Sequence, residues 1–344
     1  MAVPKRENAL DHVVVLMFEN RSFDHLLGRL YEPGEVASFE GVIGKDLSNP
    51  IPPWAEHGAD RGVVRYGVAK DMNTPYPDPG EELPHINTQL FGQIDPPSNR
   101  GVPVERMVAP YSAPADPDQV PTMDGFVTDY ISAFTAEMGR QPSYDEYSQI
   151  MTGYTPELPT YAFIEPQIIG HDHNDMHPAY SMQTPGLNFD PPSSLIAGED
   201  LLARTYNAIR SSSSAAGSNH LNTLFMVVFD EHGGTYDHVP PPVADAPDPS
   251  APAGQMDFTF SRLGVRLPAI AISPWIPEKT VVNETYRNTS MIRTMRERWN
   301  LGPPLTARDA DAPTSPSCSR STSREYHRTG PTSPHGPCLE WIRR

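Results

Sequence analysis

Four short apolar segments are spaced along the chain, and each has the composition of a buried β-strand. They are rich in Val, Ile, Phe or Tyr and cover residues 12–18, 161–164, 223–229 and 268–272. Between them lie segments whose apolar residues recur at helical spacing, at 22–30, 199–210 and 290–299. Because strands alternate with helices, we expect an α/β fold with three layers and a mostly parallel sheet.

Polar side chains with oxygen ligands follow two of these segments at the point where each strand should end. Glu19 and Asn20 come directly after the first, and Asp230 and Glu231 come directly after the third. The carboxyl ends of parallel strands meet at one edge of an open sheet, so the four side chains should converge there. Carboxylate and amide oxygens are the ligands that hard divalent cations prefer. The pattern therefore predicts a metal site.

A plainer interpretation is that the acidic residues only cap the helices that follow them. A single strand followed by an acid would favour that interpretation. Two such strands favour a site, since adjacent carboxylates repel one another unless a cation compensates them. Gly233 and Gly234, just after Asp230 and Glu231, would also allow the backbone to approach closely.

Several histidines stand near these motifs or in the loops between them. His232 and His238 flank the two glycines, a cluster in the middle of the chain contains His171, His173 and His177, and His85 lies in a long early loop. Imidazoles can bind metals, donate protons to a leaving oxygen or face a phosphate as cations. Each histidine taken alone is more often a surface or hydrogen-bonding residue.

Composition narrows the class of protein. The 344 residues include 40 prolines, and only 38% are hydrophobic, which predicts long Pro-rich loops, at 47–122 and 235–257, around the core. The net charge of −17 argues against nucleic acid as a partner. It is compatible with a phosphorylated substrate, because a bound cation inverts the local field.

The terminal segments and the cysteines bear on the location and the domain limits of the protein. Residues 1–11 lack the apolar run of a signal peptide, which predicts a cytoplasmic location by default, and no segment reaches the ~18 apolar residues of a transmembrane helix. Both cysteines lie in a Ser- and Pro-rich tail. We expect one domain over 1–312 and a disordered tail over 313–344, which is either a functional extension or the product of a shifted reading frame.

The motifs together resemble a known family. E-N-R-S-F-D-H after the first strand and F-D-E-H-G-G-T-Y-D-H-V-P-P-P after the third are similar to the phosphoesterase family of bacteria and fungi that holds phosphatidylcholine-type phospholipases C and acid phosphatases. The segments M-D-G-F, F-I-E-P, N-D-M-H-P and I-S-P-W also match its pattern. The resemblance extends over about residues 8 to 310.

This resemblance implies an alkaline-phosphatase-like core and a hydrolase that cleaves phosphoesters, either small molecules or phospholipid head groups. By analogy, one or more divalent metal ions would be held by Glu19, Asn20, Asp230 and Glu231. His85, His177 and His238 would contact the phosphoryl group or protonate the leaving alcohol. A metal-activated hydroxyl would form a covalent phospho-enzyme that water then hydrolyses. Relatives in this family are often secreted.

The chain departs from the family pattern at the nucleophile. The family carries a Thr or Ser in a segment resembling G-P-T-x-P-N-R, and no T-x-P-N-R occurs here. Pro159 runs directly into Thr160 and the second apolar segment, which indicates a deletion in the core near 159–160. The alternative function is therefore a catalytically inactive relic, or a protein that binds a metal or ligand without turnover. A sulfatase is disfavoured because its C/S-x-P-x-R signature is missing from the sequence.

Overall fold

The apolar segments form a single mixed sheet. The computed structural model describes residues 9–53, 60, 62–69, 79–101, 158–168, 173–178, 195–212 and 218–314. Within them, four strands lie in the order β4-β1-β5-β6: β4 (Tyr161–Ile164), β1 (His12–Phe18), β5 (Thr223–Phe229) and β6 (Ile270–Ile272). β1 pairs in parallel with both β4 and β5. The predicted mostly parallel sheet is confirmed.

β6 is the exception to this parallel arrangement. It pairs antiparallel with β5 and begins at Ile270, two residues later than the apolar pattern predicts. Pro268 explains the late start, since a proline cannot donate a hydrogen bond to the ladder. The other three strands have the predicted bounds.

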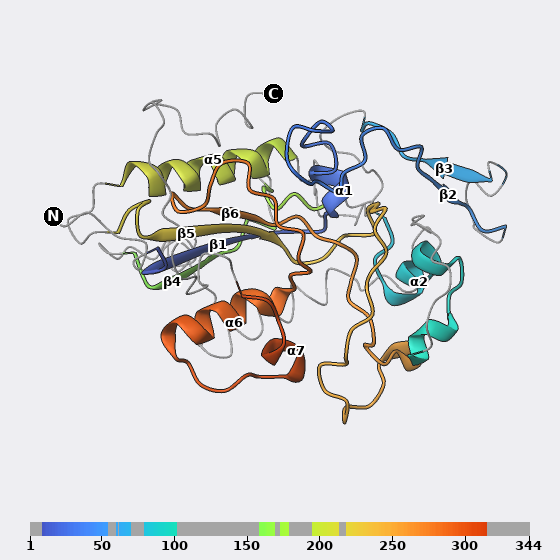
Figure 1. Ribbon diagram of the computed structural model, residues 1–344. Helices are drawn as coiled ribbons and strands as arrows, with labels where there is room; N and C mark the ends of the chain where they lie inside the picture. Colours follow the sequence, from blue (N-terminus) through green and yellow to red (C-terminus); the bar gives the residue numbers. More distant parts are fainter. Residues whose placement is uncertain are drawn as a thin grey trace, which may run out of the picture.

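Helices cover both faces of the sheet (Figure 1). α5 (Leu195–Ser211) packs on the face formed by Val14, Leu16 and Phe18, and α6 (Asn288–Trp299) packs on the face formed by Val13 and Val15. This division follows from the alternation of side chains along a strand. Both faces of β1 are buried, which explains why its sequence is an almost continuous apolar run.

The helices differ from prediction mainly at their ends. α1 (Phe23–Leu26) has Ser22 as its N-cap residue and is shorter than the predicted 22–30. α5 begins four residues before the predicted 199, and α6 begins at Asn288 instead of 290. A side-chain hydrogen bond from the Arg287 backbone N–H to Ser290 Oγ, 3.0 Å long, fixes the start of α6. A final short helix, α7 (Ala307–Ala310), contacts α6.

The early region predicted as a loop contains regular structure. It holds an antiparallel pair, β2 (Ser48–Pro50) with β3 (Val63–Arg65), then α2 (Leu83–Phe91) and the 3₁₀ helix η3 (Pro97–Arg100). Figure 1 shows α1 and α2 beyond one end of the sheet. Residues 235–257 are irregular except for the 3₁₀ helix η4 (Gln255–Asp257).

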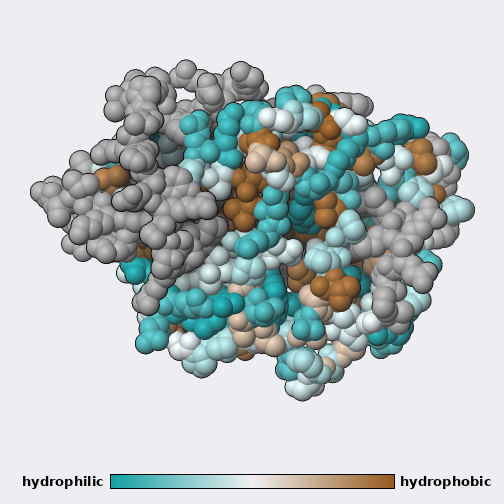
Figure 2. Space-filling view, in the orientation of Figure 1, coloured by the Kyte–Doolittle hydropathy of each residue, from teal (hydrophilic) through white to brown (hydrophobic). Residues whose placement is uncertain are grey.

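The remaining features concern the surface, possible membrane-spanning helices and the C-terminal tail. On the face drawn in Figure 2, hydrophobic residues appear in separate groups between hydrophilic ones. No helix in the described part of the chain combines the length and apolar character needed to cross a bilayer. The predicted disordered tail lies outside the described residues from position 315 onward.

The fold depends on the core between β1 and β5, so we expect Phe225→Ala to destabilise it strongly. Phe225 is 1% exposed and packs in the cluster that contains Leu16 and Phe18. Its truncation should lower the free energy of unfolding by about 3–5 kcal/mol, because transfer and cavity costs add. Urea denaturation measures this. Phe163→Ala on edge strand β4, where the side chain is 48% exposed, is the matched control and should cost far less. Equal losses would contradict this account of the core.

Candidate metal and phosphoester site

The pairing of β1 with β5 sets the geometry of the site. Their register places Phe18 beside Phe229, so Glu19 and Asp230 leave the sheet as neighbours. The backbone N–H of Asp230 donates to the Phe18 carbonyl at 3.1 Å, just before the chains diverge. The structure thereby brings the two acidic motifs together at the carboxyl ends of the parallel strands.

Asp230 organises the backbone around it. Its Oδ1 accepts hydrogen bonds from the backbone N–H of Asn20 at 2.8 Å and of Glu231 at 2.6 Å. The backbone N–H of Arg21 donates to the Glu231 carbonyl at 3.1 Å. These contacts hold Asn20 in a left-handed conformation with φ of 57°. Asn is among the few residues that adopt this conformation readily.

The Glu19 carboxyl group lies in a strongly electronegative position. Burial, the charge of Asp230, a hydrogen bond with Asp230, and the charges of Asp175 and Glu165 together raise the pKa of Glu19 to about 8. A protonated Glu19 donates to Asp230 in the absence of a cation. Such an arrangement of oxygen ligands with excess negative charge fits a divalent cation, which would displace the proton.

Glu231 is the other carboxylate of this group. Burial raises its pKa, but the hydrogen bond and charge of His232, the backbone N–H of Gly233 and a hydrogen bond with Glu81 outweigh burial and lower it. His232 Nδ1 lies 3.4 Å from Glu231 Oε2. Glu231 is therefore held ionised, as a metal ligand must be.

Asn20 contacts two side chains that come from distant parts of the chain. Its Nδ2 lies 2.5 Å from Glu81 Oε2 and 2.7 Å from His177 Nε2. His177 Nδ1 lies 2.7 Å from the Pro178 carbonyl oxygen. Burial lowers the pKa of His177, although this carbonyl opposes the shift. His177 thus belongs to the same cluster as Asn20.

The two glycines after His232 let the motif pack closely, as their position in the sequence predicts. Gly233 has φ of 57°, and a side chain there would collide with the backbone of Asn20. Gly234 has φ of 62°, and its Cβ would lie 2.6 Å from the Gly80 carbonyl oxygen. Only glycine meets both the conformational and the steric demand at these positions.

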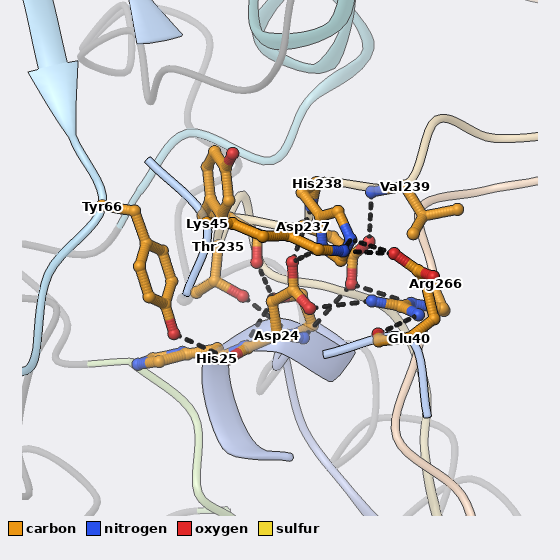
Figure 3. A network of polar contacts seen from close by, with 12 residues as sticks. Asp24, His25, Glu40, Lys45, Tyr66, Thr235, Asp237, His238, Val239 and Arg266 are labelled. Carbon is orange, nitrogen blue, oxygen red and sulfur yellow. Dashed lines mark hydrogen bonds and ion pairs between the residues drawn. The ribbon is translucent and has the colours of Figure 1, made fainter. Parts of the chain in front are cut away.

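A second polar network lies beside α1 and is drawn in Figure 3. His238 Nδ1 lies 2.5 Å from Asp24 Oδ2, and His238 Nε2 lies 2.8 Å from Glu40 Oε1. Arg266 donates to Asp24 Oδ1 at 2.7 Å and to Asp237 Oδ2 at 3.1 Å. Asp24 and Asp237 are almost fully buried, and this network ties α1 to the end of the motif that begins at Asp230.

The same network offers an alternative place for a cation. Asp24, Asp237 and His238 each provide a ligand atom, and these atoms lie within 4.8 Å of one another. Their negative charge is already compensated by the Arg266 guanidinium, and Lys45 Nζ lies 2.6 Å from His238 Nε2. A divalent ion would have to displace or face these cations, so the donor set fits a structural ion network better than a metal centre.

The predicted site residues therefore fall into separate groups. Hydrogen bonds link Asp230 to Glu19, Asn20 and Glu231, and Asn20 to His177, whereas His238 lies in the network with Asp24. His85 is buried on α2, four residues beyond Glu81. Their catalytic and ligand roles remain predictions. His171 lies outside the described residues, and His173 Nδ1 lies 3.9 Å from Asp175 Oδ2.

Two residues of the cluster were not singled out by the sequence. Glu81 contacts Asn20 and Glu231 from the loop before α2. Asp175 accepts from the Glu19 N–H through its carbonyl, at 2.9 Å, and from the His177 N–H through Oδ1, at 3.0 Å. Both lie close in sequence to a predicted histidine, and this proximity was the available sign that their segments approach the site. Only the folded chain shows which residue of each segment reaches it.

We compared the sequence with those of known protein families. Residues 153–302 match the model described as the phosphoesterase family, and that range contains β5 and the motif that follows it. The chain is similar to this family over those 150 residues and has distant homology to phospholipases C of plants and bacteria. This match agrees with the resemblance carried by the second acidic motif, which lies inside the matched range.

Relatives within the family extend the match over most of the chain. Non-specific phospholipase C6 of Arabidopsis thaliana is 27% identical over 387 aligned residues, which cover 90% of this chain and 72% of that protein. Non-specific phospholipase C3 of the same plant is 37% identical over 166 residues, which cover 44% of this chain but only 28% of the relative. Phospholipase C A of Mycobacterium tuberculosis (strain CDC 1551 / Oshkosh) is 33% identical over 92 residues, covering 24% of this chain and 18% of that one.

Because of Asp237 in the second network, we expect the stability of the protein to fall as pH rises through the mildly acidic range. Burial and the charge of Asp24 raise the pKa of Asp237 to about 6 from 3.8, despite the opposing effect of Arg266. The folded state then binds this proton more tightly than the unfolded state, so stability falls as pH rises from about 4 to about 6.

Asp237→Asn should remove this contribution. Relative to the variant, the wild-type protein should lose about 3 kcal/mol of unfolding free energy over that pH interval, because one pKa unit corresponds to about 1.4 kcal/mol. Chemical denaturation of both proteins in EDTA across the interval measures the difference. Parallel pH profiles would show that Asp237 does not take up the proton.

Proposed function

We propose that the protein is a divalent-cation-dependent phosphoesterase of the phospholipase C type, with an alkaline-phosphatase-like core of three layers. The observation that carries the proposal is the in-register pairing of β1 with β5, which sets Glu19 and Asn20 beside Asp230 and Glu231. The match to the phosphoesterase family and the names of the plant and mycobacterial relatives support phosphate esters of lipids as the substrate class.

The side chains divide the work of such a site. Glu19, Asn20, Asp230 and Glu231 would hold one or more divalent ions, whose charge would attract a phosphate group to an otherwise acidic protein. The carboxyl groups of Glu231 and Asp230 would supply the charge, and the side-chain carbonyl of Asn20 would supply a neutral ligand. His177 and, by family analogy, His85 and His238 would contact the phosphoryl group or protonate the leaving alcohol.

Asp230→Asn tests the proposal. The variant should lose more than roughly 100-fold of any phosphodiesterase activity, since even outer-shell changes at metal sites cost 10–100-fold. Hydrolysis of p-nitrophenyl phosphorylcholine with added Mn²⁺, compared with p-nitrophenyl phosphate, measures it and separates diester from monoester specificity. Glu82→Ala, from the loop that contains Glu81, is the matched control. Unchanged activity in Asp230→Asn would contradict the proposed ligand set.

A second candidate is a protein of this family that binds a cation and a phosphoester without turnover. The specific observation in its favour is the short path into β4: the Pro159 carbonyl oxygen lies 3.1 Å from His12 Nδ1, and Thr160 follows immediately at the start of the strand. The alignment with phospholipase C6 is also longer than this 344-residue chain, so that relative has internal segments with no counterpart here.

Under this second candidate, the protein as it stands should show little or no turnover. A G-P-T-x-P-N-R segment inserted between Pro159 and Thr160 should then raise phosphodiesterase activity by several orders of magnitude, because it would supply the hydroxyl nucleophile. The same insertion with Ala in place of the Thr is the control. Equal activity with and without the insertion would show that another group acts as the nucleophile.

A further inference from the structure

Glu81 reaches the proposed cation site from an unexpected direction. It lies in the loop before α2, and the Gly80 carbonyl beside it accepts a hydrogen bond from Gln89 Nε2 at 2.6 Å. Gly234 packs against that same carbonyl so closely that a side chain would not fit. The backbone of Glu81 is thus held between α2 and the motif that follows β5, and its carboxyl group contacts Asn20 and Glu231.

The contact between Glu81 and Asn20 fixes the orientation of an amide. Asn20 is 3% exposed, and its Nδ2 carries two protons. One is donated to Glu81 Oε2 over 2.5 Å. The other points at His177 Nε2, 2.7 Å away. A flipped amide would place its oxygen next to Glu81 Oε2 and His177 Nε2, and both of these hydrogen bonds would be lost.

His177 can accept that second proton because of its own tautomer. Its Nδ1 lies 2.7 Å from the Pro178 carbonyl, which is only an acceptor, so Nδ1 carries the ring proton. Nε2 is then a lone-pair acceptor for the Asn20 amide. With both amide protons used, Oδ1 is the remaining polar atom of the side chain, and no group among the described residues donates a hydrogen bond to it.

We propose that Glu81 is a positioning residue: together with His177, it holds the Asn20 amide so that Oδ1 is presented to the cation. The inference rests on the proposed cation site formed with Glu19, Asp230 and Glu231. It assigns to Glu81 the role of an outer partner that orients a ligand, which is how metal sites are usually completed. A direct ligand would depend on the charge of Glu81, whereas a positioning residue depends on its acceptor oxygen.

Mn²⁺ affinity, measured by EPR titration of the full chain, distinguishes these roles. Glu81→Ala should weaken Mn²⁺ binding about 10–100-fold, the usual cost of losing an outer-shell partner. Glu81→Gln keeps an oxygen that accepts from the Asn20 amide, so its Mn²⁺ affinity should stay within about threefold of wild type. Glu82→Ala, one residue away, should match wild type. Equal weakening by Glu81→Ala and Glu81→Gln would overturn the positioning role.

Combining Glu81→Ala with Asn20→Asp distinguishes a loss of orientation from simple misfolding. Asn20→Asp replaces the amide by a carboxylate whose two oxygens are equivalent, so there is nothing left to orient. Glu81→Ala should then cause no further loss of Mn²⁺ affinity. A full 10-fold additional loss in this background would overturn the inference.

A wrong role for Glu81 and a wrong cation site would give different results. If the wild-type protein binds Mn²⁺, Asp230→Asn abolishes binding and Glu81→Ala matches wild type, only the role of Glu81 is wrong. If the wild-type protein binds no Mn²⁺, the proposed cation site is wrong and the positioning role is overturned with it.

Discussion

The parallel pairing of β1 with β5 is the interaction on which the rest of the structure depends. Seven consecutive residue pairs from His12 and Thr223 onward fix the register, and the buried apolar side chains on both faces allow no slip. A shift of one residue would exchange the side chains that pack against α5 with those that pack against α6, and it would offset Glu19 from Asp230. The site is therefore a consequence of strand register, and its residues need not be close in sequence.

The region beyond the carboxyl ends of the strands contains two groups of acidic side chains, which differ in how their negative charge is compensated. In the network around Asp24, the carboxylates are paired with Arg266 and with a histidine that also approaches Glu40 and Lys45. Around Glu19, the neighbouring charges are all acidic, and the pKa of Glu19 rises to about 8. Buried charges need partners. The first group finds them within the protein, while at the second we propose that a cation from solution supplies the partner.

Local patterns in the sequence predicted the parts of this structure that depend on local chemistry. Apolar runs identified β1, β4 and β5 with their bounds, and the strand-then-acid pattern identified the residues that converge. The sequence did not reveal α2 within a Pro-rich stretch, or the antiparallel direction of β6. Nor could spacing show that Glu81 reaches Asn20, or that His238 joins Asp24, because those contacts arise only when distant loops pack.

Anomalous diffraction from crystals soaked with Mn²⁺ tests the central claim most directly, since it locates the ion without reference to activity. The account predicts a peak enclosed by the oxygens of Glu19, Asn20, Asp230 and Glu231. A peak at Asp24, Asp237 and His238 instead, or no peak at either place under saturating Mn²⁺, would contradict it.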